Sequence, residues 1–190
     1  MSDEKSRESS PADLTPSLVV ELREGRADAA KLLDRLYRPR LTRFSLGYLG
    51  RWEEAEDVVQ DVFCKVLENP TVPERFRPWV YEICRNKCLD RLRAQNRRLD
   101  DQTLPESSMI NGQLTGQLTR LVKTEKRELL VKRLGTLPNE QREVLLLRYT
   151  EGLSRAEIAE VLDIPEKLVK HRIYNGLERL RKHTSLANDS

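Results

Sequence analysis

The sequence has 190 residues, enough for one ordinary domain or two small ones. Its 38% hydrophobic, 34% charged and 5% aromatic residues favour short helices with narrow apolar faces over a thick sheet-based core. Apolar runs are too short to span a bilayer, and the first residues lack the apolar run of a signal peptide. We therefore expect no membrane insertion and a cytoplasmic location.

The sequence has three cysteines, at positions 64, 84 and 88. This small, odd number argues against a disulfide framework. Cys84 and Cys88 would share one face of a helix, but His171 and His183 lie far away in the sequence. We predict ordinary buried thiols there, with no metal and no cofactor.

The N-terminal part of the chain begins with a polar, Ser- and Pro-containing stretch, residues 1–15, which we expect to be a disordered tail. Apolar residues at helical spacing follow over residues 18–22, 29–37 and 41–49. Gly25 interrupts this pattern, and Pro39 allows only a kink or a restart of the helix.

The clearest helical pattern comes next, and it is acidic. Its buried stripe is predicted to consist of Ala55, Val58, Val59, Val62, Phe63, Val66 and Leu67. Between Arg51 and Glu68 the sequence has six acidic residues and only two basic ones. The Asn69–Pro70 step should end the helix. Trp52 precedes the acidic run, either as a hydrophobic staple or as a partner contact.

A basic helix is predicted after a short loop that contains Pro73 and Pro78. Its inward residues are Trp79, Val80, Ile83, Cys84, Cys88 and Leu92. Trp79 is most simply a core residue. Six basic residues against the single Asp90 lie between Arg85 and Arg98. Such a run indicates either a polyanion contact or a merely solvated helix face.

Residues 99–124 are rich in polar residues, Gly and Pro, and we interpret them as a flexible linker. Helical spacing resumes at residue 125, and Pro138 restarts the chain at a favourable first-turn position. Gly152 is placed to close the next helix, and Ser154 and Glu157 form the pattern of a capping box. No strand-like alternation is sustained anywhere in the sequence.

The segment from Arg155 to Ile173 has the layout of a helix-turn-helix. Its core positions would be Ile158, Ala159, Leu162, Ile164 and Val169. The second helix, which Pro165 can start, would offer a major groove Lys167, Leu168, Lys170, His171, Tyr174 and Asn175. A small helical hairpin that only packs a core is the alternative, and this motif alone does not exclude it.

Three segments together carry a resemblance to a known family. The segment LPNEQREVLLLRYTEGLSRAEIAEVLDIPEKLVKHRIYNGLERLRKH resembles domain four of bacterial RNA polymerase sigma factors, which reads the minus-thirty-five promoter element. AEDVVQDVFCKVLEN is similar to the family's acidic polymerase-binding helix, and RPWVYEICRNKCLDRLRAQNRR to the helix that reads the minus-ten element. With these two domains alone, the chain resembles the extracytoplasmic-function (ECF) group.

The resemblance implies an all-α fold: domain two at residues 16–98, the linker, and domain four, with its helix-turn-helix, at residues 125–186. It implies core RNA polymerase (the beta-prime clamp and the beta flap) and promoter DNA as partners, and an anti-sigma factor as a further one. The implied polymerase-binding residues are Asp57, Gln60, Asp61 and Lys65. The implied minus-ten residues are Arg85, Asn86, Arg93 and Arg97. The implied minus-thirty-five residues are Lys167, Lys170, His171, Arg172, Tyr174 and Asn175, with Arg172 in packing or phosphate contact.

The sequence departs from the family pattern at three places. The loop over residues 69–77 is short, Glu82 stands where an arginine is usual, and Asn175–Gly176 replaces a common Arg–Ala pair. The Asn–Gly pair removes a cation and weakens helix propensity in the recognition helix. These departures bear on which promoter sequence is read rather than on the class of protein.

Two other functions compete with a sigma factor. A stand-alone helix-turn-helix regulator accounts for residues 155–183 but leaves the acidic helix and the first basic helix unexplained. A purely helical adaptor leaves both basic segments unexplained. The sequence has no Gly-rich phosphate loop and no catalytic constellation in plausible register, so we do not expect an enzyme.

Overall fold

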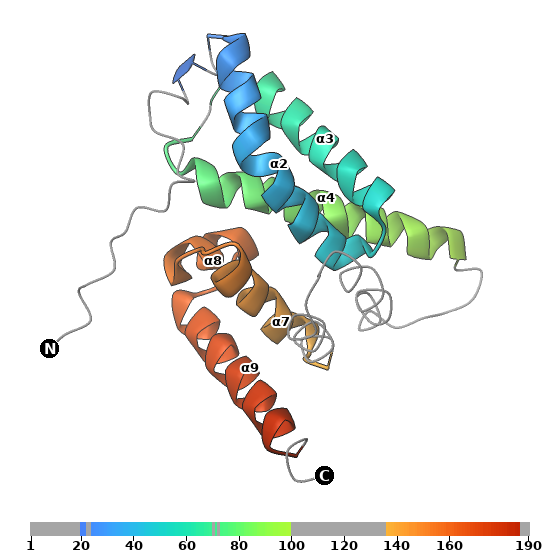
Figure 1. The fold of residues 1–190 in the computed structure, drawn as a ribbon, viewed down its shortest axis with the longest axis vertical. Coiled ribbons are helices and arrows are strands. Elements are labelled where there is room, and N and C mark those ends of the chain that lie inside the picture. The colour runs from blue at the N-terminus through green and yellow to red at the C-terminus, as the bar shows by residue number, and fades with distance from the viewer. Residues whose placement is uncertain (1–19, 22–23, 70, 72, 100–135, 187–190) are drawn as a thin grey trace, which may run out of the picture.

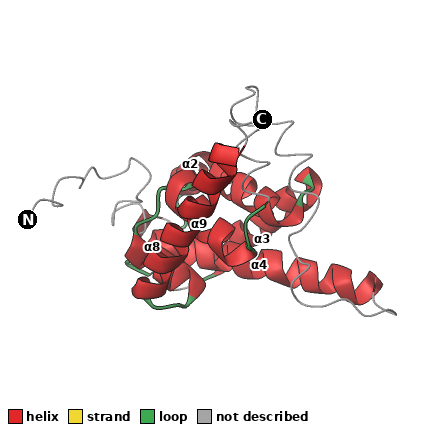
Figure 2. Ribbon diagram, turned by 90° about the horizontal axis from the view of Figure 1, so that it is seen from below, coloured by secondary structure: helices red, strands yellow, loops and turns green. Residues whose placement is uncertain are grey.

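The computed structural model describes residues 20–21, 24–69, 71, 73–99 and 136–186. Every regular element within these residues is a helix (Figure 2), which confirms the predicted all-α fold. The N-terminal group consists of α2 (Ala27–Leu49), α3 (Trp52–Glu68) and α4 (Phe76–Leu99). The C-terminal group consists of α7 (Asn139–Leu145), the π-helix η2 (Leu146–Thr150), α8 (Arg155–Leu162) and α9 (Glu166–Leu186). The predicted tail, the linker after Leu99 and the predicted helical residues 125–135 lie outside the described residues.

Helix α2 continues through Pro39, so the restart that Pro39 allowed does not occur. The helix ends at Gly50, whose φ of 70° lies in the left-handed region and whose N–H donates to the Leu46 carbonyl at 3.0 Å. Glycine adopts this conformation without the strain that a side chain would add. The sharp turn sends the chain directly into α3.

Helix α3 buries six of the seven residues of its predicted stripe, but the prediction for Leu67 is wrong. Leu67 is 56% exposed because the helical step places it beside Gln60 and Cys64, which are exposed as well. The helix ends at Glu68, before the Asn69–Pro70 step, as the sequence predicts.

Helix α4 begins at Phe76, earlier than the sequence suggested, so Pro78 lies in its first turn and not in a loop. A proline is tolerated there because the first N–H groups of a helix have no partner within the helix. The loop before α4 is therefore even shorter than the sequence indicated, and it was already short for the family.

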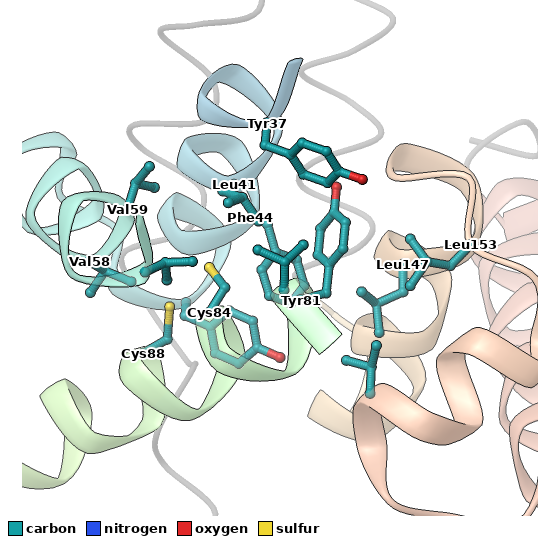
Figure 3. Close-up of a cluster of buried hydrophobic side chains, with 14 of the residues drawn as sticks. Tyr37, Leu41, Phe44, Val58, Val59, Tyr81, Cys84, Cys88, Leu147 and Leu153 are labelled. Carbon is teal, nitrogen blue, oxygen red and sulfur yellow. The ribbon is translucent and has the colours of Figure 1, made fainter. Parts of the chain in front are cut away.

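The N-terminal group encloses an aromatic-rich core. Phe44 contacts Tyr81 edge to face with ring centroids 5.4 Å apart, and Tyr37 contacts Phe76 in the same way at 5.5 Å. Cys84 and Cys88 are buried on the core side of α4 (Figure 3), where the Cys84 sulfur lies 3.1 Å from the Ser45 hydroxyl of α2, which confirms the prediction of buried thiols. Trp79 packs partly buried against this core, whereas Trp52, the first residue of α3, is 46% exposed.

The C-terminal group contains the predicted helix-turn-helix. The Ser154 hydroxyl accepts from the Glu157 N–H at 3.2 Å, and the Glu157 carboxylate accepts from the Ser154 N–H at 2.6 Å, so the capping box is complete. Asp163, at a φ of 52°, ends α8, and Pro165 leads into α9. Ile158 and Val169, one on each helix, are fully buried between them.

Gly176 of α9 lies against α7. A Cβ atom built there would lie 2.9 Å from a methyl carbon of Leu145 and 3.4 Å from the Cβ of Gln141. A larger residue would clash with α7, so glycine is required here although it lowers the helix propensity of α9. Because the residue is buried, the Asn–Gly departure changes the packing of α9 as well as its charge.

The two groups pack against each other, with α8 lying across α4 (Figure 1). Leu147 and Leu153 of the C-terminal group are fully buried and join the core cluster that contains Tyr81 (Figure 3). We call this contact the junction. Within the described ranges, none of the helices combines the length and apolar character needed to cross a membrane.

Candidate functional site

The outer face of α3 carries the four residues that the resemblance assigns to polymerase. Asp57, Asp61 and Lys65 follow one another at intervals of four, and Gln60 lies three residues after Asp57, so helical geometry places all four on one side, opposite the buried stripe. The Asp57 and Asp61 side chains are 65% and 47% exposed. This face is open to a partner and has a net negative charge.

Basic residues of α4 border the same face. The Arg91 guanidinium lies 3.8 Å from the Asp57 carboxylate and 3.9 Å from that of Asp61, and the Lys87 ammonium lies 4.0 Å from Asp61. Exposed pairs at such distances contribute little to stability, so a partner's cations can replace them. The acidic face is therefore available for binding at small cost.

The outer face of α4 brings together three of the four residues that the resemblance assigns to the minus-ten element. Asn86, Arg93 and Arg97 are exposed and follow one another at intervals of seven and four. Arg93 pairs with Asp90 at 3.1 Å on the surface. Glu82 is exposed one turn before Asn86, so it brings a negative charge to the same face.

Arg85 differs from these three residues because it points into the junction. Its guanidinium donates to the Glu143 carboxylate at 2.7 Å, and its side chain is only 24% exposed. Burial lowers the pKa of Arg85, and the neighbouring Arg172 and Arg93 act in the same direction. Tyr48 of α2 also donates to Glu143. Burial raises the pKa of Glu143 to about 7, while Arg172 acts to lower it.

The N-terminal half of α9 presents the third face. Lys167, Lys170, His171 and Tyr174 are exposed, and their spacing places them on one side of the helix together with Asn175. The Asn175 amide and the His171 ring are 2.9 Å apart, one turn from each other. This face combines cations with the amide, imidazole and phenol groups that contact base edges and phosphates.

Arg172 lies off this face. Its guanidinium pairs with Glu140 of α7 at 2.8 Å, and its side chain is 18% exposed. Of the two roles considered for it, packing agrees with this position. The structure therefore groups five of the six residues assigned to the minus-thirty-five element and separates the sixth.

Sequence reasoning missed the residues that hold the junction together. The Glu151 side chain is 1% exposed, and its carboxylate accepts from Arg43 at 3.1 and 3.3 Å and from the Tyr81 hydroxyl at 2.7 Å. Burial and Glu151 both raise the pKa of Tyr81. Burial acts to lower the pKa of Arg43, but Glu151 outweighs this effect and the net shift is upward. Glu151 lies 70 positions from Tyr81 and 108 from Arg43, so no local pattern could link it to them.

Two family models match the chain, in the same order as these faces. Residues 33–98 match sigma-70 region 2, and residues 127–180 match sigma-70 region 4. The first match contains the α3 and α4 faces, and the second contains the α9 face. Together the two matches cover well over half of the chain.

Curated relatives extend the likeness over nearly the whole chain. The chain is 28% identical to the ECF RNA polymerase sigma factor SigW of Bacillus subtilis, over 86% of this chain and 93% of that protein. It is also 28% identical to the ECF RNA polymerase sigma-E factor of Escherichia coli, over 88% of this chain and 93% of that protein. The chain belongs to the sigma-70 family and, within it, to the ECF group of RNA polymerase sigma factors.

Solved structures share the fold. CnrH, solved in complex with the cytosolic domain of CnrY, is 25% identical and superposes with a TM-score of 0.61 over 92% of this chain and 97% of CnrH. The sigma factor RpoE of Bartonella quintana, solved in complex with the anti-sigma factor NepR, is 22% identical. It superposes with a TM-score of 0.60 over 80% of this chain and 94% of its own.

Proposed function

We propose that this chain binds core RNA polymerase through the outer face of α3 and directs promoter-specific initiation through the outer faces of α4 and α9. The observation that carries the proposal is the placement of three exposed faces on one chain. The first face has a net negative charge, and the other two carry exposed cations, Arg93 and Arg97 on α4 and Lys167 and Lys170 on α9. An acidic face suits a basic protein partner, and cationic faces suit DNA phosphates.

The proposed polymerase contact uses Asp57, Gln60, Asp61 and Lys65 against the beta-prime clamp, with the C-terminal group on the beta flap. The carboxylates of Asp57 and Asp61 are exposed one turn apart and form a compact negative patch. Each already forms a long ion pair with a basic side chain of α4. Charge complementarity of this kind sets the rate and specificity of association more than its strength.

The proposed promoter contacts are divided between the two groups. Asn86, Arg93 and Arg97, with Arg85 once it is released from Glu143, would hold the minus-ten element. The α9 face, with Lys167, Lys170, His171, Tyr174 and Asn175, would enter the major groove at the minus-thirty-five element. Arg172 would support this face through Glu140.

The proposal divides the chain into a tail at residues 1–15, domain two at 16–98, a linker at 99–124 and domain four at 125–186. The matches to regions 2 and 4, residues 33–98 and 127–180, both lie wholly inside the two proposed domains. We assign the site of action to the cytoplasm and the catalytic step of transcription to the polymerase, not to this chain. An anti-sigma partner, which the Bartonella quintana protein has, remains a prediction for this one.

Run-off transcription with core polymerase purified from the bacterium that encodes this chain tests the function. We expect promoter-specific transcripts only when this protein is added, and a stable complex with core enzyme on gel filtration. Absence of a complex would contradict the proposal. Tight, specific binding of a duplex operator by the protein alone would point to a stand-alone regulator.

A further inference from the structure

The α9 face contains two polar side chains that bond to each other. The Asn175 amide nitrogen lies 2.9 Å from Nε2 of His171, which is four residues earlier and therefore one turn away on the same side of the helix. His171 is exposed and Asn175 is half-buried. A hydrogen bond between side chains one turn apart on an open helix surface adds little stability, so the fold itself does not require this pair.

The direction of the hydrogen bond follows from the two atoms. An amide nitrogen carries two N–H donors and cannot accept, so Nε2 of His171 is the acceptor. The imidazole is therefore neutral in this arrangement and carries its proton on Nδ1. One N–H of Asn175 is used by His171. One N–H and the carbonyl oxygen remain for another partner.

The groups that remain on Asn175 match adenine. In the major groove, adenine presents its N6 amino group as a donor and N7 as an acceptor, which complement a carbonyl oxygen and one N–H. Guanine presents acceptors at both O6 and N7. Its O6 would face the Asn175 oxygen, acceptor against acceptor, with no second N–H to satisfy it. The paired amide therefore favours adenine and rejects guanine.

An unpaired asparagine lacks this restriction. Its amide can turn about the last side-chain torsion and offer both N–H groups to the two acceptors of guanine, or one N–H and the oxygen to adenine. His171 thus adds discrimination by occupying one donor, without contacting the base itself. The effect belongs to the orientation of the Asn175 amide and not to its presence alone.

The pair also gives a meaning to one departure from the family pattern. Asn175 stands where the family commonly has an arginine, and arginine pairs with the two acceptors of guanine. The side chain here has one donor and one acceptor left, so its complement is a different base. The departure therefore predicts a changed preference at one promoter position.

We propose that Asn175 reads an adenine of the minus-thirty-five element, and that His171 is a positioning residue that fixes the Asn175 amide in the orientation that accepts adenine and rejects guanine. This inference rests on the proposed role of the α9 face at the minus-thirty-five element. It names the base that the face selects and the residue that sets the selection.

Selection of holoenzyme-bound fragments from a promoter library, randomised over the minus-thirty-five element, tests the reading. The position read by Asn175 is the one at which Asn175→Ala abolishes the wild-type preference. We expect wild type to favour adenine over guanine there by about tenfold or more, the discrimination of a bidentate contact. If wild type selects a promoter but Asn175→Ala changes the preference at no position, or if the preferred base is guanine, the reading is overturned.

Three substitutions of His171 test its positioning role. His171→Gln keeps an acceptor and should preserve the adenine preference, whereas His171→Leu removes the acceptor and should weaken that preference by about threefold or more. His171→Lys has only donors, so it should bond the Asn175 oxygen, turn the amide and favour guanine. An adenine preference that survives in both His171→Leu and His171→Lys would overturn the positioning role. A change confined to another promoter position would mean that His171 reads its own base, and would overturn that role too.

Leu177→Lys is the matched control for the added charge. Leu177 is 42% exposed and lies seven residues after Lys170, on the same side of α9. Its replacement should tighten binding to all fragments alike and leave the ratio of adenine to guanine unchanged, because a lysine on phosphate carries no sequence information. An equal shift toward guanine in Leu177→Lys and His171→Lys would assign the effect to charge and overturn the inference.

The pair itself is measured apart from promoter binding, by nitrogen-15 NMR of the full chain. We expect the proton of the His171 ring on Nδ1, with Nε2 accepting from the Asn175 amide, and loss of this coupling in Asn175→Ala. A proton on Nε2 would overturn the inference even if the holoenzyme recognises promoters. If the pair is present but the holoenzyme selects no promoter, the proposed function falls and the reading of adenine falls with it.

Discussion

The N-terminal and C-terminal groups differ in how far the packing between them covers their proposed DNA-binding faces. In the C-terminal group, the α9 face lies away from the junction, with Lys170 and Tyr174 exposed. In the N-terminal group, Asn86, Arg93 and Arg97 are exposed as well, but Arg85 is held by Glu143. Packing of the two groups thus covers part of the proposed minus-ten face and leaves the proposed minus-thirty-five face exposed.

The difference shows that the side of the helix on which a residue lies decides whether it is exposed to a partner. Arg85 and Asn86 are neighbours in sequence, yet one faces the C-terminal group and the other faces solvent. Successive residues on a helix point about 100° apart, so a contact on one flank leaves the next flank free. The two faces of this protein should therefore respond unequally to changes at the junction.

The largest effect is expected on the acidic face, which the junction does not touch. Reversing both charges in an Asp57→Lys/Asp61→Lys variant sets like charges against a basic partner, which costs several kcal/mol and should weaken polymerase binding by about a hundredfold or more. The lost pairs with Arg91 are long and exposed, so folding should not suffer. Gel filtration with core polymerase measures the loss.

The matched control for that variant is Glu24→Lys/Asp28→Lys, with the same charge change on exposed residues before and at the start of α2. It should bind polymerase within about twofold of wild type, because surface substitutions away from a site cost little. An equal loss in both variants would mean that net charge, and not the α3 face, governs binding.

The next effect in size concerns the uncovered α9 face. Lys170→Ala should cost about 1–3 kcal/mol of promoter binding and relax the preference at one position if the lysine reads a base. A uniform loss across all sequences would indicate a phosphate contact. Holoenzyme binding to a set of single-base promoter variants distinguishes the two outcomes.

The same substitution sharpens the comparison between the two groups. Since Lys170 lies off the junction, its loss should be equal in the wild type and in a Glu151→Lys variant, which loses the hydrogen bonds from Arg43 and Tyr81. Lys182→Ala, further along α9 and 70% exposed, is the control and should have little effect. A Lys170 effect that appears only in the Glu151→Lys variant would mean that packing at the junction covers the α9 face too.

The features that the sequence predicted correctly rest on local patterns. The end of α3 before Pro70 follows from the steric effect of proline on the preceding residue, and the start of α8 from the reciprocal bonds of Ser154 and Glu157. The exposed faces follow from the helical repeat, because polar residues three and four apart must share a side. Patterns of this kind are complete within a few residues.

The features that the sequence missed depend on distant contacts. Leu67 is exposed because neighbouring helices, not its own hydrophobicity, decide how wide the buried stripe is. The requirement for Gly176 arises from Leu145 on another helix. The partners of Glu151 lie 70 and 108 residues away, and nothing near that residue indicates them. Tertiary packing therefore decides that two of the predicted site arginines, Arg85 and Arg172, are largely covered.

A smaller effect tests whether the two groups unfold together. Ser154→Ala removes half of the capping box and should cost about 1 kcal/mol of the free energy of unfolding of the C-terminal group. Both tryptophans, Trp52 and Trp79, lie in the N-terminal group, so their fluorescence follows that group alone. Because the core is continuous across the junction, the fluorescence midpoint in urea should shift along with the midpoint seen by circular dichroism. A shift in circular dichroism alone would show that the groups unfold independently.

The smallest effect is a pH dependence of the packing at the junction. Burial raises the pKa of Glu143 to about 7, so closing the junction favours the protonated carboxyl over the open, solvated one. The stabilisation is fully present below the ordinary carboxyl range and is lost as pH rises toward 7. The charged and titratable groups that face this carboxyl are Tyr48 of α2, Arg85 of α4 and Arg172 of α9.

The radius of gyration should therefore increase between about pH 5 and pH 7 and then level off. Glu143→Gln keeps the hydrogen-bonding shape of the protonated carboxyl without its ionisation, so this variant should stay compact across the whole interval. If Glu143→Gln kept the full pH dependence, the titrating group would lie elsewhere.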